Sequence, residues 1–285
     1  MEQSCTLGEL LIDQLALTIE DNTLVFHGFG SPLVQIALHV AKRVYAPNLV
    51  LVAGATYGVN PNPPFIAPTT NDWVHDRDAE CHLSIGELFD LSASGRLGRM
   101  FLSGIQIDRW GNTNVTKVGR ASLKIKLPGG GGACNLSCNT KFLTLWTAAH
   151  RSDHAHKGKR RYRIVSECDY VTGFGHKNTD GVTRKQLGYR GNGPQWLITD
   201  LGVFDFDRSG HLRLDSLYPH TSVEEVIDNT EFKPKIKNNI KTVSLPSSEV
   251  LSIIRKLDPL RVHEKELLSR DRSVMLGESN YAEIS

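Results

Sequence analysis

The sequence predicts an α/β fold built on an open, mostly parallel or mixed sheet with helices on both faces. Helix-like and strand-like segments alternate in the first half of the chain, as they do in βαβ units. Residues 48–53, NLVLVA, form a nearly continuous apolar strand of the kind that a parallel sheet buries on both faces. Strand-like segments dominate the second half, and no internal repeat is visible.

Local signals place the elements in order along the chain. Residues 7–17 have a helical apolar spacing, and a short apolar strand at 23–26 leads into HGFGSP. Ser31 and Pro32 then suit the cap and first turn of a helix over 33–43. Further helices are expected around 86–91 and, capped by Ser222, from 223 onward. Strand-like patterns are found at 100–104, 104–108, 121–127, 161–165, 169–172, 195–199 and 201–206, whereas the apolar segment 142–149 is of uncertain type.

The length and composition are those of a globular protein with an ample core. The chain has 285 residues, of which 40% are hydrophobic and 22% charged. We expect one α/β domain over residues 1–265 and a mobile tail over 266–285. Residues 60–71, which are rich in Pro and Asn, form a candidate linker loop.

Charge and hydropathy argue against nucleic-acid and membrane partners. The net charge is +2, from 33 basic and 31 acidic residues, which is too balanced for a nucleic-acid or membrane surface. No run of about 18 apolar residues exists. The first residues predict an amphipathic helix and not a signal peptide, so we expect a cytosolic protein.

The five cysteines are odd in number and scattered, unlike a disulfide framework. Cys134 and Cys138 precede His150, His154 and His156, and thiolate and imidazole are zinc ligands. The CxxC spacing of zinc turns is absent, however, and we expect no metal.

Two motifs between residues 104 and 138 carry the most information. The first, GIQIDRWGNTNV, alternates polar and apolar residues as a strand does and turns at Trp110-Gly111-Asn112. The second, LPGGGGACNLSC, contains four consecutive glycines, Gly129 to Gly132. Such a run exposes backbone amides, which suit a phosphate or the oxyanion of an attacked acyl group. The alternative interpretation is a flexible Gly-rich linker.

Four motifs in order resemble the family I coenzyme A transferases, specifically the β subunits of the glutaconate CoA-transferase type. The resemblance runs from about Val25 to Arg261 and rests on GIQIDRWGNTN, LPGGGGACNL, CDYVTGFGH and ITDLGVFDFDRSGHLRLDSLYPHTSVEEV. It implies an open α/β fold, pairing with a homologous α subunit in a heterodimer or heterotetramer, and an active site at the subunit junction. The implied substrates are acyl-CoA thioesters, so coenzyme A is part of the substrate and no bound cofactor is expected.

One departure from the family concerns its nucleophile. Family transferases carry a glutamate in a motif resembling Glu-Ser-Gly-x-x-Gly, which attacks the thioester carbonyl. In this sequence the corresponding segment is AGATYG, residues 53–58, which places Ala53 at the glutamate position. No Glu or Asp occurs between Asp21 and Asp72, so the covalent chemistry lacks its carboxylate here.

Three interpretations follow from this departure. The first is a β subunit of a hydrolytic enzyme acting on a CoA thioester, similar to the ring-cleaving hydrolases of steroid degradation, which LGVFDFD and IRKLDPLRVHEKE also resemble. The second is a transferase that uses a carboxylate of the partner subunit. The third is a non-catalytic ligand-sensing or scaffold subunit.

The resemblance also implies roles for individual residues. The family's Gly-x-Gly-Gly-Ala loop matches Gly130, Gly131, Gly132 and Ala133, whose amides would face the thioester oxygen. Gln106 is a candidate substrate contact within the catalytic set. The candidate substrate-binding residues are Asp108, Asn112, Asn114, Asn135 (where the family often has Asp), Ala53 and Gly54. The alternative for Asn112 and Asn114 is a structural role in the turn, where the side chain bonds to nearby backbone. We expect structural roles for Asp205 and Asp207.

A basic cluster is the remaining candidate for contacting the CoA phosphates. It comprises Lys157, Lys159, Arg160, Arg161 and Arg163. A solvated loop and strand edge is the alternative explanation.

Overall fold

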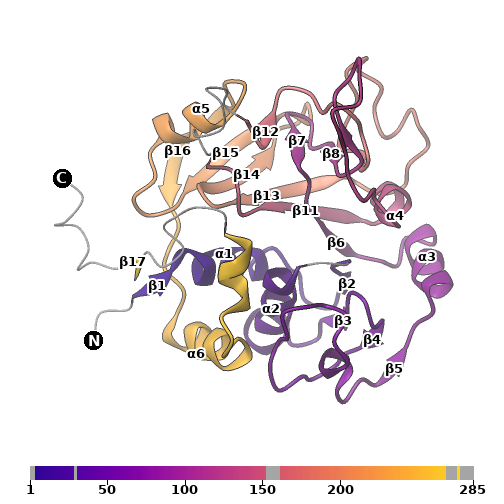
Figure 1. Ribbon diagram of the computed structural model, residues 1–285, viewed down its shortest axis with the longest axis vertical. Coiled ribbons are helices and arrows are strands. Elements are labelled where there is room, and N and C mark those ends of the chain that lie inside the picture. The colour runs from indigo at the N-terminus through magenta and orange to yellow at the C-terminus, as the bar shows by residue number, and fades with distance from the viewer. Residues whose placement is uncertain (1–3, 29–30, 152–160, 268–274, 277–285) are drawn as a thin grey trace. The chain divides into compact units, whose positions relative to one another are not determined.

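The computed structural model describes residues 4–28, 31–151, 161–267 and 275–276. Its internal contacts divide the chain into two compact units. Unit 1 comprises residues 1–84 and 243–285, and unit 2 comprises residues 85–242. Figure 1 labels the elements of both. The prediction of a single domain over 1–265 stays a prediction.

Unit 1 contains a small mixed sheet. Strand β2 (Leu24–Phe26) pairs in parallel with β3 (Val50–Val52), and the antiparallel strands β4 (Gly58–Val59) and β5 (Cys81–His82) extend the sheet. A separate antiparallel pair joins β1 (Cys5–Thr6) to β17 (Met275–Leu276). Because β2 and β3 are parallel, their carboxyl ends lie at the same edge, where α/β proteins commonly place their sites.

Helices α1 (Leu7–Ala16), α2 (Pro32–Val40) and α6 (Ser248–Leu257) pack against one another in unit 1. Ser31 caps α2 as predicted, because its hydroxyl accepts the Val34 N–H at 3.1 Å. All nine residues of α2 are buried, and the helix continues into a π-helical turn, Ala41–Tyr45. Two 3-10 turns, Trp73–Asp76 and Val262–Glu266, complete the unit.

Unit 2 is built on six neighbouring strands. The first three, β6 (Arg99–Leu102), β11 (Phe142–Thr147) and β13 (Pro194–Thr199), are parallel. They continue into antiparallel β14 (Gly202–Phe206) and β15 (Leu212–Leu217), and β16 (Lys235–Thr242) is parallel to β15. The helices of this unit are α3 (Ile85–Ala93), α4 (Ala133–Asn139) and α5 (Val223–Asn229). The mixed sheets and the helices between their strands confirm the predicted α/β class.

A second, three-stranded sheet in unit 2 carries the first sequence motif. Strand β7 (Gln106–Asp108) lies between β12 (Ile164–Val165) and β8 (Thr113–Asn114). A further pair, β9 (Lys117–Val118) and β10 (Ile125–Lys126), follows. The turn predicted at Trp110-Gly111-Asn112 is confirmed, since it joins β7 to β8.

Two predicted strands differ from the structure. Only Ile125–Lys126 of the segment 121–127 is a strand, because residues 120–126 are exposed and have no face to bury. Residues 169–172 form no strand, because Asp169 and Thr172 bond individually to the β7–β8 hairpin instead of to a ladder. The segment 142–149, whose type was uncertain, contains strand β11.

The C-terminal segment makes specific contacts where it is described. The Glu266 carboxylate accepts the Leu33 N–H at 2.9 Å and the Ser31 hydroxyl at 3.1 Å. Burial raises the pKa of Glu266 to about 7. Apart from Met275–Leu276 in β17, residues 268–285 lie outside the described residues, and the mobility expected for 266–285 stays a prediction.

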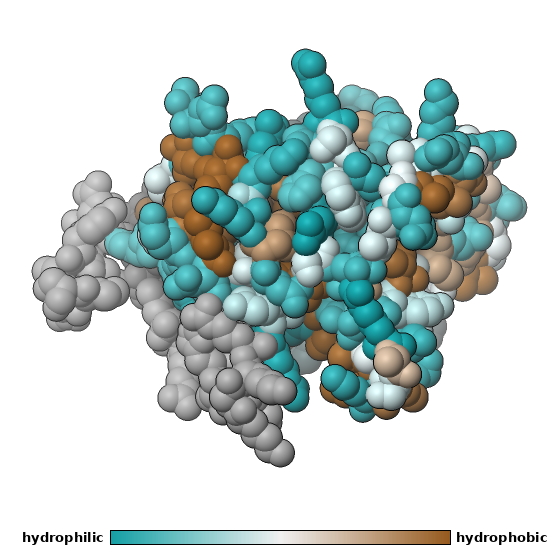
Figure 2. Space-filling view, turned by 90° about the horizontal axis from the view of Figure 1, so that it is seen from above, coloured by the Kyte–Doolittle hydropathy of each residue, from teal (hydrophilic) through white to brown (hydrophobic). Residues whose placement is uncertain are grey.

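The surface combines a hydrophilic majority with local apolar areas. On the face drawn in Figure 2, hydrophobic residues gather in separate patches among hydrophilic ones. The exposed apolar side chains of unit 2 include Leu123, Ile125, Tyr170 and Val171. Within the described ranges, no helix combines the length and apolar character that a bilayer span requires.

Candidate functional site

The loop between β3 and β4 in unit 1 carries Ala53 and Gly54. Ala53 is buried at the end of β3, and its N–H donates to the Gly58 carbonyl at 2.9 Å. The loop closes tightly, because the Tyr57 N–H donates back to the Ala53 carbonyl at 3.1 Å and Tyr57 has a left-handed φ of 60°. The position aligned with the family glutamate is therefore a small apolar residue on an ordered loop.

His27 holds this loop from the neighbouring strand end. The Gly54 N–H donates to His27 Nε2 at 2.9 Å. A Cβ at position 54 would lie 2.0 Å from the Gly28 carbonyl oxygen and 2.5 Å from His27 Cε1, so only glycine fits. Burial lowers the pKa of His27 to about 3, which keeps the imidazole neutral with its hydrogen on Nδ1. Within the described part of the chain, His27 Nδ1 has no hydrogen-bond partner.

Asp108 organises the β7–β8 hairpin of unit 2. Its Oδ1 accepts the Trp110 N–H at 2.9 Å and the Asn112 N–H at 3.0 Å, and its Oδ2 accepts the Asn112 side-chain amide at 2.9 Å. Burial raises the pKa of Asp108 to about 6 although these hydrogen bonds act in the opposite direction. Both carboxylate oxygens are occupied by the hairpin itself.

Asn112 and Asn114 are likewise saturated by protein partners. Asn112 also donates to the Lys177 carbonyl and accepts the Gly175 N–H, at 2.9 and 2.8 Å. Asn114 donates to Gln106 Oε1 and to the Lys117 carbonyl, both at 2.7 Å, and accepts the Thr116 N–H at 3.0 Å. These bonds match the structural role in the turn that the sequence left open as the alternative.

Gln106 differs from its neighbours because one end of its amide is available. Its Oε1 accepts Asn114 Nδ2–H and the Asp169 N–H, the latter at 3.0 Å. Its Nε2 has no acceptor among the residues that the structure describes, and the side chain is half-buried. The oxygen contacts fix the amide orientation and leave two donor hydrogens for another group.

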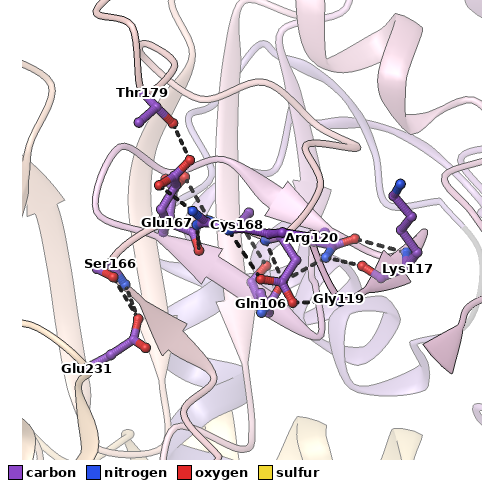
Figure 3. Close-up of polar contacts among 12 residues, drawn as sticks. Gln106, Lys117, Gly119, Arg120, Ser166, Glu167, Cys168, Thr179 and Glu231 are labelled. Atoms are coloured by element: carbon purple, nitrogen blue, oxygen red, sulfur yellow. Dashed lines mark hydrogen bonds and ion pairs between the residues drawn. The ribbon is translucent and has the colours of Figure 1, made fainter. Parts of the chain in front are cut away.

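Figure 3 shows how the segment after β12 docks beside Gln106. Asp169 accepts the Gly119 N–H at 2.8 Å and pairs with Arg120 at 3.4 Å. Arg120 also pairs with Glu167 at 2.8 Å. These partly exposed pairs add modest stability individually, but together they fix the backbone that orients Gln106.

The tetraglycine loop precedes α4 and is anchored by close packing. A Cβ on Gly130 would lie 2.4 Å from Thr172 Cγ2, and one on Gly132 would lie 2.9 Å from Phe89 Cζ. Gly131 has a φ of 51° and nothing within 4 Å of its Cβ position. This packing is unlike that of a flexible linker.

The loop leaves several amides available. The N–H groups of Gly130, Gly131 and Gly132 have no acceptor in the described part of the chain, whereas the Ala133 N–H donates to the Gly130 carbonyl at 2.8 Å. Asn135, on α4, is exposed. Consecutive free amides can bind an oxyanion or a phosphate oxygen.

Thr172 joins the two motifs of unit 2. Its methyl group packs on Gly130, and its hydroxyl accepts the Val115 N–H at 3.1 Å, directly after β8. The structure therefore brings the glycine loop and the β7–β8 hairpin together. Ala53 and Gly54 belong to unit 1 and form a separate local arrangement.

Other candidates have structural partners or lie outside the described residues. Asp205 pairs with Arg213 at 2.7 Å, and Asp207 pairs with Lys235, which agrees with the structural roles expected. His150 is buried between Thr199 and Thr230, at 3.1 and 3.0 Å. No group of three or more His, Cys, Asp or Glu side chains in the described ranges is placed to hold a metal. The predicted residues that fall outside those ranges are His154, His156, Lys157, Lys159 and Arg160.

Sequence reasoning missed two side chains near the β3–β4 loop, Asp76 and His82. His82 Nε2 donates to Asp76 Oδ2, next to Gly58. Their spacing matches no motif, and the pairing of β4 with β5, each two residues long, brings them together. No local pattern in the sequence signals this contact.

The fold and these loops define an α/β protein that has a glycine loop with unbonded backbone amides and a tightly closed turn after a buried strand. The family model described as coenzyme A transferase matches residues 9–229. The chain therefore belongs to the coenzyme A transferase family, which confirms the resemblance based on the four motifs.

Individual relatives narrow the comparison to the β-type chains of this family. The chain is 28% identical over 255 residues to the B subunit of 3-oxoadipate CoA-transferase from Pseudomonas knackmussii, covering 88% of this chain and 92% of the relative. It is 31% identical over 258 residues to the B subunit of glutaconate CoA-transferase from Acidaminococcus fermentans, covering 86% and 90%. It is 29% identical over 255 residues to the cholesterol ring-cleaving hydrolase IpdB subunit of Rhodococcus jostii, covering 85% and 91%.

A solved structure agrees with these relatives. The decarboxylase AibA/AibB superposes with a TM-score of 0.78 at 26% identity, covering 93% of this chain and 99% of that chain. The family fold thus extends over nearly the whole sequence.

Proposed function

We propose that this chain is the β subunit of an enzyme that hydrolyses a CoA-bearing substrate, at the thioester or at a ring carbon–carbon bond. The observation that carries the proposal is Ala53, a buried methyl side chain where the family motif has its glutamate nucleophile. Without that carboxylate, the covalent anhydride route has no starting group at this position. A relative named as a ring-cleaving hydrolase supports this branch.

In this proposal, the loops of unit 2 provide the hydrogen-bond donors that polarise the substrate carbonyl. The free amides of Gly130, Gly131 and Gly132 stabilise the oxyanion that forms when water adds to a carbonyl, and one such donor contributes about 3 kcal/mol in a preorganised site. Gln106 Nε2 donates to the substrate from a fixed orientation. The exposed amide of Asn135 keeps hydrogen-bonding reach without charge.

Asp108, Asn112 and Asn114 act as positioning residues in this proposal, because their polar atoms already bind protein partners. Ala53 and Gly54, in unit 1, form a tightly packed loop that carries no reactive side chain. The chemistry is addition of water to the carbonyl carbon followed by cleavage of the C–S or C–C bond, with the proton passing to the leaving group.

A homologous α subunit completes the enzyme in this proposal. Two relatives are named as B subunits, and the decarboxylase AibA/AibB carries two component names. Leu123, Ile125, Tyr170 and Val171 are exposed apolar side chains of unit 2 that such a partner would cover. We expect the chain alone to be poorly soluble or inactive, and a monodisperse, fully active homo-oligomer in light scattering and assay would contradict this.

A conventional acyl-CoA:carboxylate CoA-transferase is the second candidate. The 31% identity to a glutaconate CoA-transferase chain favours it. In that case the partner subunit supplies the carboxylate.

The decisive experiment co-purifies the native partner and screens CoA thioesters with and without an acceptor acid. Thiol release in water alone, or gain of one water by an intact CoA conjugate in mass spectrometry, supports the hydrolase. Turnover that requires the acceptor acid supports the transferase. A complex that binds thioesters and turns over none supports a sensing or scaffold subunit and refutes both enzymes.

A further inference from the structure

The stretch between Asp108 and Asp153 contains no Asp or Glu. It includes β8, the β9–β10 pair, the glycine loop and α4, all of which belong to unit 2. Basic residues are concentrated just before the glycine loop, at positions 117, 120, 124 and 126. Positive charge without neighbouring acids, next to unbonded backbone amides, is typical of a site for an anion.

Strand register places Lys117 and Lys126 directly opposite one another. They are partners in the antiparallel β9–β10 pair, in which Val118 is the partner of Ile125. Opposite residues project from the same face, so the two lysine side chains share one face of the pair and the two apolar side chains share the other. Like charges that oppose one another in this way lower stability, so the fold itself does not require them.

Three lysines of this strand pair are available to a ligand. Lys124 precedes Lys126 by two positions, so strand alternation puts it on the same face. Lys124 and Lys126 are exposed. Lys117 Nζ lies 5.3 Å from the centre of the Tyr170 ring, and Figure 3 shows its side chain extending away from the polar contacts drawn there. We call Lys117, Lys124 and Lys126 the lysine face.

The carboxylates closest to the lysine face in Figure 3 are already engaged. Arg120 pairs with Glu167 at 2.8 Å and with Asp169 at 3.4 Å. Within the described ranges of the chain, no ammonium group of the lysine face forms an ion pair. The positive charge of this face is therefore left for a group that the chain does not contain.

The lysine face leads directly into the glycine loop. The Gly129 N–H donates to the Val115 carbonyl at 2.9 Å, so the strand pairing continues past β10 to the first glycine. Lys126 precedes Gly130 by four residues, which span at most about 14 Å of extended chain. One elongated ligand is thus able to reach both the lysine face and the unbonded amides of the loop.

Protection of a sheet edge is the simpler explanation, because exposed lysines discourage pairing with another chain. It accounts for single lysines such as Lys124. It does not account for two lysines placed directly opposite one another in a stretch without any acidic residue. Nor does it account for their position next to the glycine loop.

We propose that the lysine face binds the phosphate groups of a CoA-bearing substrate while the glycine loop binds the carbonyl oxygen at the other end of the same ligand. This inference rests on the proposed function for the identity of the substrate. Lysine ammonium groups are common phosphate ligands, and in CoA the pantetheine arm separates the phosphates from the thioester. The apolar face, with Val118 and Ile125, remains for the partner subunit.

The test titrates free CoA into the co-purified complex by calorimetry, which measures binding without turnover. Lys117→Gln and Lys126→Gln should each weaken CoA affinity about 3- to 10-fold, and the double variant about 10- to 100-fold, because each removes one charge-assisted contact. Lys241→Gln is the matched control, because it neutralises an exposed lysine on β16 of the same unit, and it should bind CoA as the wild type does. Added salt should weaken the wild type more than the double variant.

A truncated ligand shows which part of CoA the lysines contact. Pantetheine lacks the phosphates, so the wild-type complex should bind CoA at least about 10-fold more tightly than pantetheine. This preference should largely disappear in the double variant. Equal losses of affinity for CoA and for pantetheine would overturn the assignment, and so would unchanged CoA affinity in the double variant.

Stability and assembly distinguish phosphate binding from the other roles. Because Lys126→Gln removes one of two opposed like charges, its midpoint of chemical denaturation should equal or exceed that of the wild type. A lower midpoint would assign the lysines to the fold, and release of the partner in light scattering would assign them to the subunit contact; either result overturns the proposal. Failure of the proposed function is a different result, namely a complex that binds CoA through these lysines and hydrolyses no CoA conjugate.

Discussion

Adding one methyl group at Gly130 tests whether the glycine loop is locked by the hairpin. In Gly130→Ala the new Cβ would lie 2.4 Å from Thr172 Cγ2, whereas ordinary contacts begin at 3.4 Å, so the two groups must separate by 3.4 − 2.4 = 1.0 Å. Overpacking of this kind costs about 1–3 kcal/mol. The φ of Gly130 is outside the left-handed region, so alanine also stabilises the fold by about 0.4–1 kcal/mol, because it restricts the unfolded chain. We expect a net loss of about 1–2 kcal/mol.

Thr172→Ser removes the clashing methyl group and keeps the hydroxyl that accepts the Val115 N–H. Alone it should cost about 0.5–1.5 kcal/mol, as deletion of one buried methyl group does. In the double variant the clash is absent, so the two changes should be non-additive by about 1–2 kcal/mol.

Chemical denaturation of the four proteins, each in its co-purified complex, measures this coupling. The turnover rate should change in parallel with stability: it should fall in Gly130→Ala and recover in the double variant. Additive free energies, or a single variant as stable as wild type, would refute the contact and the locked loop with it.

Three further predictions concern single sites. Burial raises the pKa of Asp108 from 3.8 to about 6, so the folded chain binds that proton more tightly than the unfolded chain, and the free energy of unfolding should fall by up to about 3 kcal/mol as pH rises from about 4 to about 6. That fall is the contribution of Asp108 alone, so denaturation across that range should show a free energy that falls more, or rises less, with pH in the wild type than in Asp108→Asn; a difference of the opposite sign would contradict the burial argument. Gly54→Ala places a Cβ 2.0 Å from the Gly28 carbonyl oxygen and should cost about 3 kcal/mol, whereas Gly95→Ala, with φ 76° and open space, should cost only about 1 kcal/mol; equal losses in thermal unfolding would count against the crowding at Gly54. Gly131→Val is strained by about 1–2 kcal/mol at the left-handed φ of 51°, but its Cβ has no protein atom within 4 Å, so the variant should fold with reduced stability and lose turnover because its side chain shields the free amides; a normal rate would remove the oxyanion assignment.

Local chemistry made much of the fold predictable. Ser31 and Ser222 cap α2 and α5 as expected, since each hydroxyl accepts an N–H three residues onward. The apolar run that predicted a buried strand contains β3. The turn at Trp110–Asn112 also follows from residue types, because Asp108 bonds the backbone of the residues that make it.

Contacts distant in sequence were not predictable. The segment 169–172 has strand-like residues, but Asp169 and Thr172 bond to side chains and carbonyls of the β7–β8 hairpin. Asp76 meets Gly58 through strands only two residues long, which carry no periodic pattern. The occupied polar atoms of Asn112 and Asn114 likewise appear only when their partners from residues 175–177 and 106 are in place.

Trapping of acyl-enzyme during turnover tests most directly whether this chain works without a covalent carboxylate intermediate. The co-purified complex is quenched with hydroxylamine or borohydride while it consumes a CoA substrate, and the peptides of this chain are weighed. We predict sustained product formation with the peptide spanning residues 53–58 unmodified. A hydroxamate or a reduced carboxylate on any residue of this chain would contradict the account.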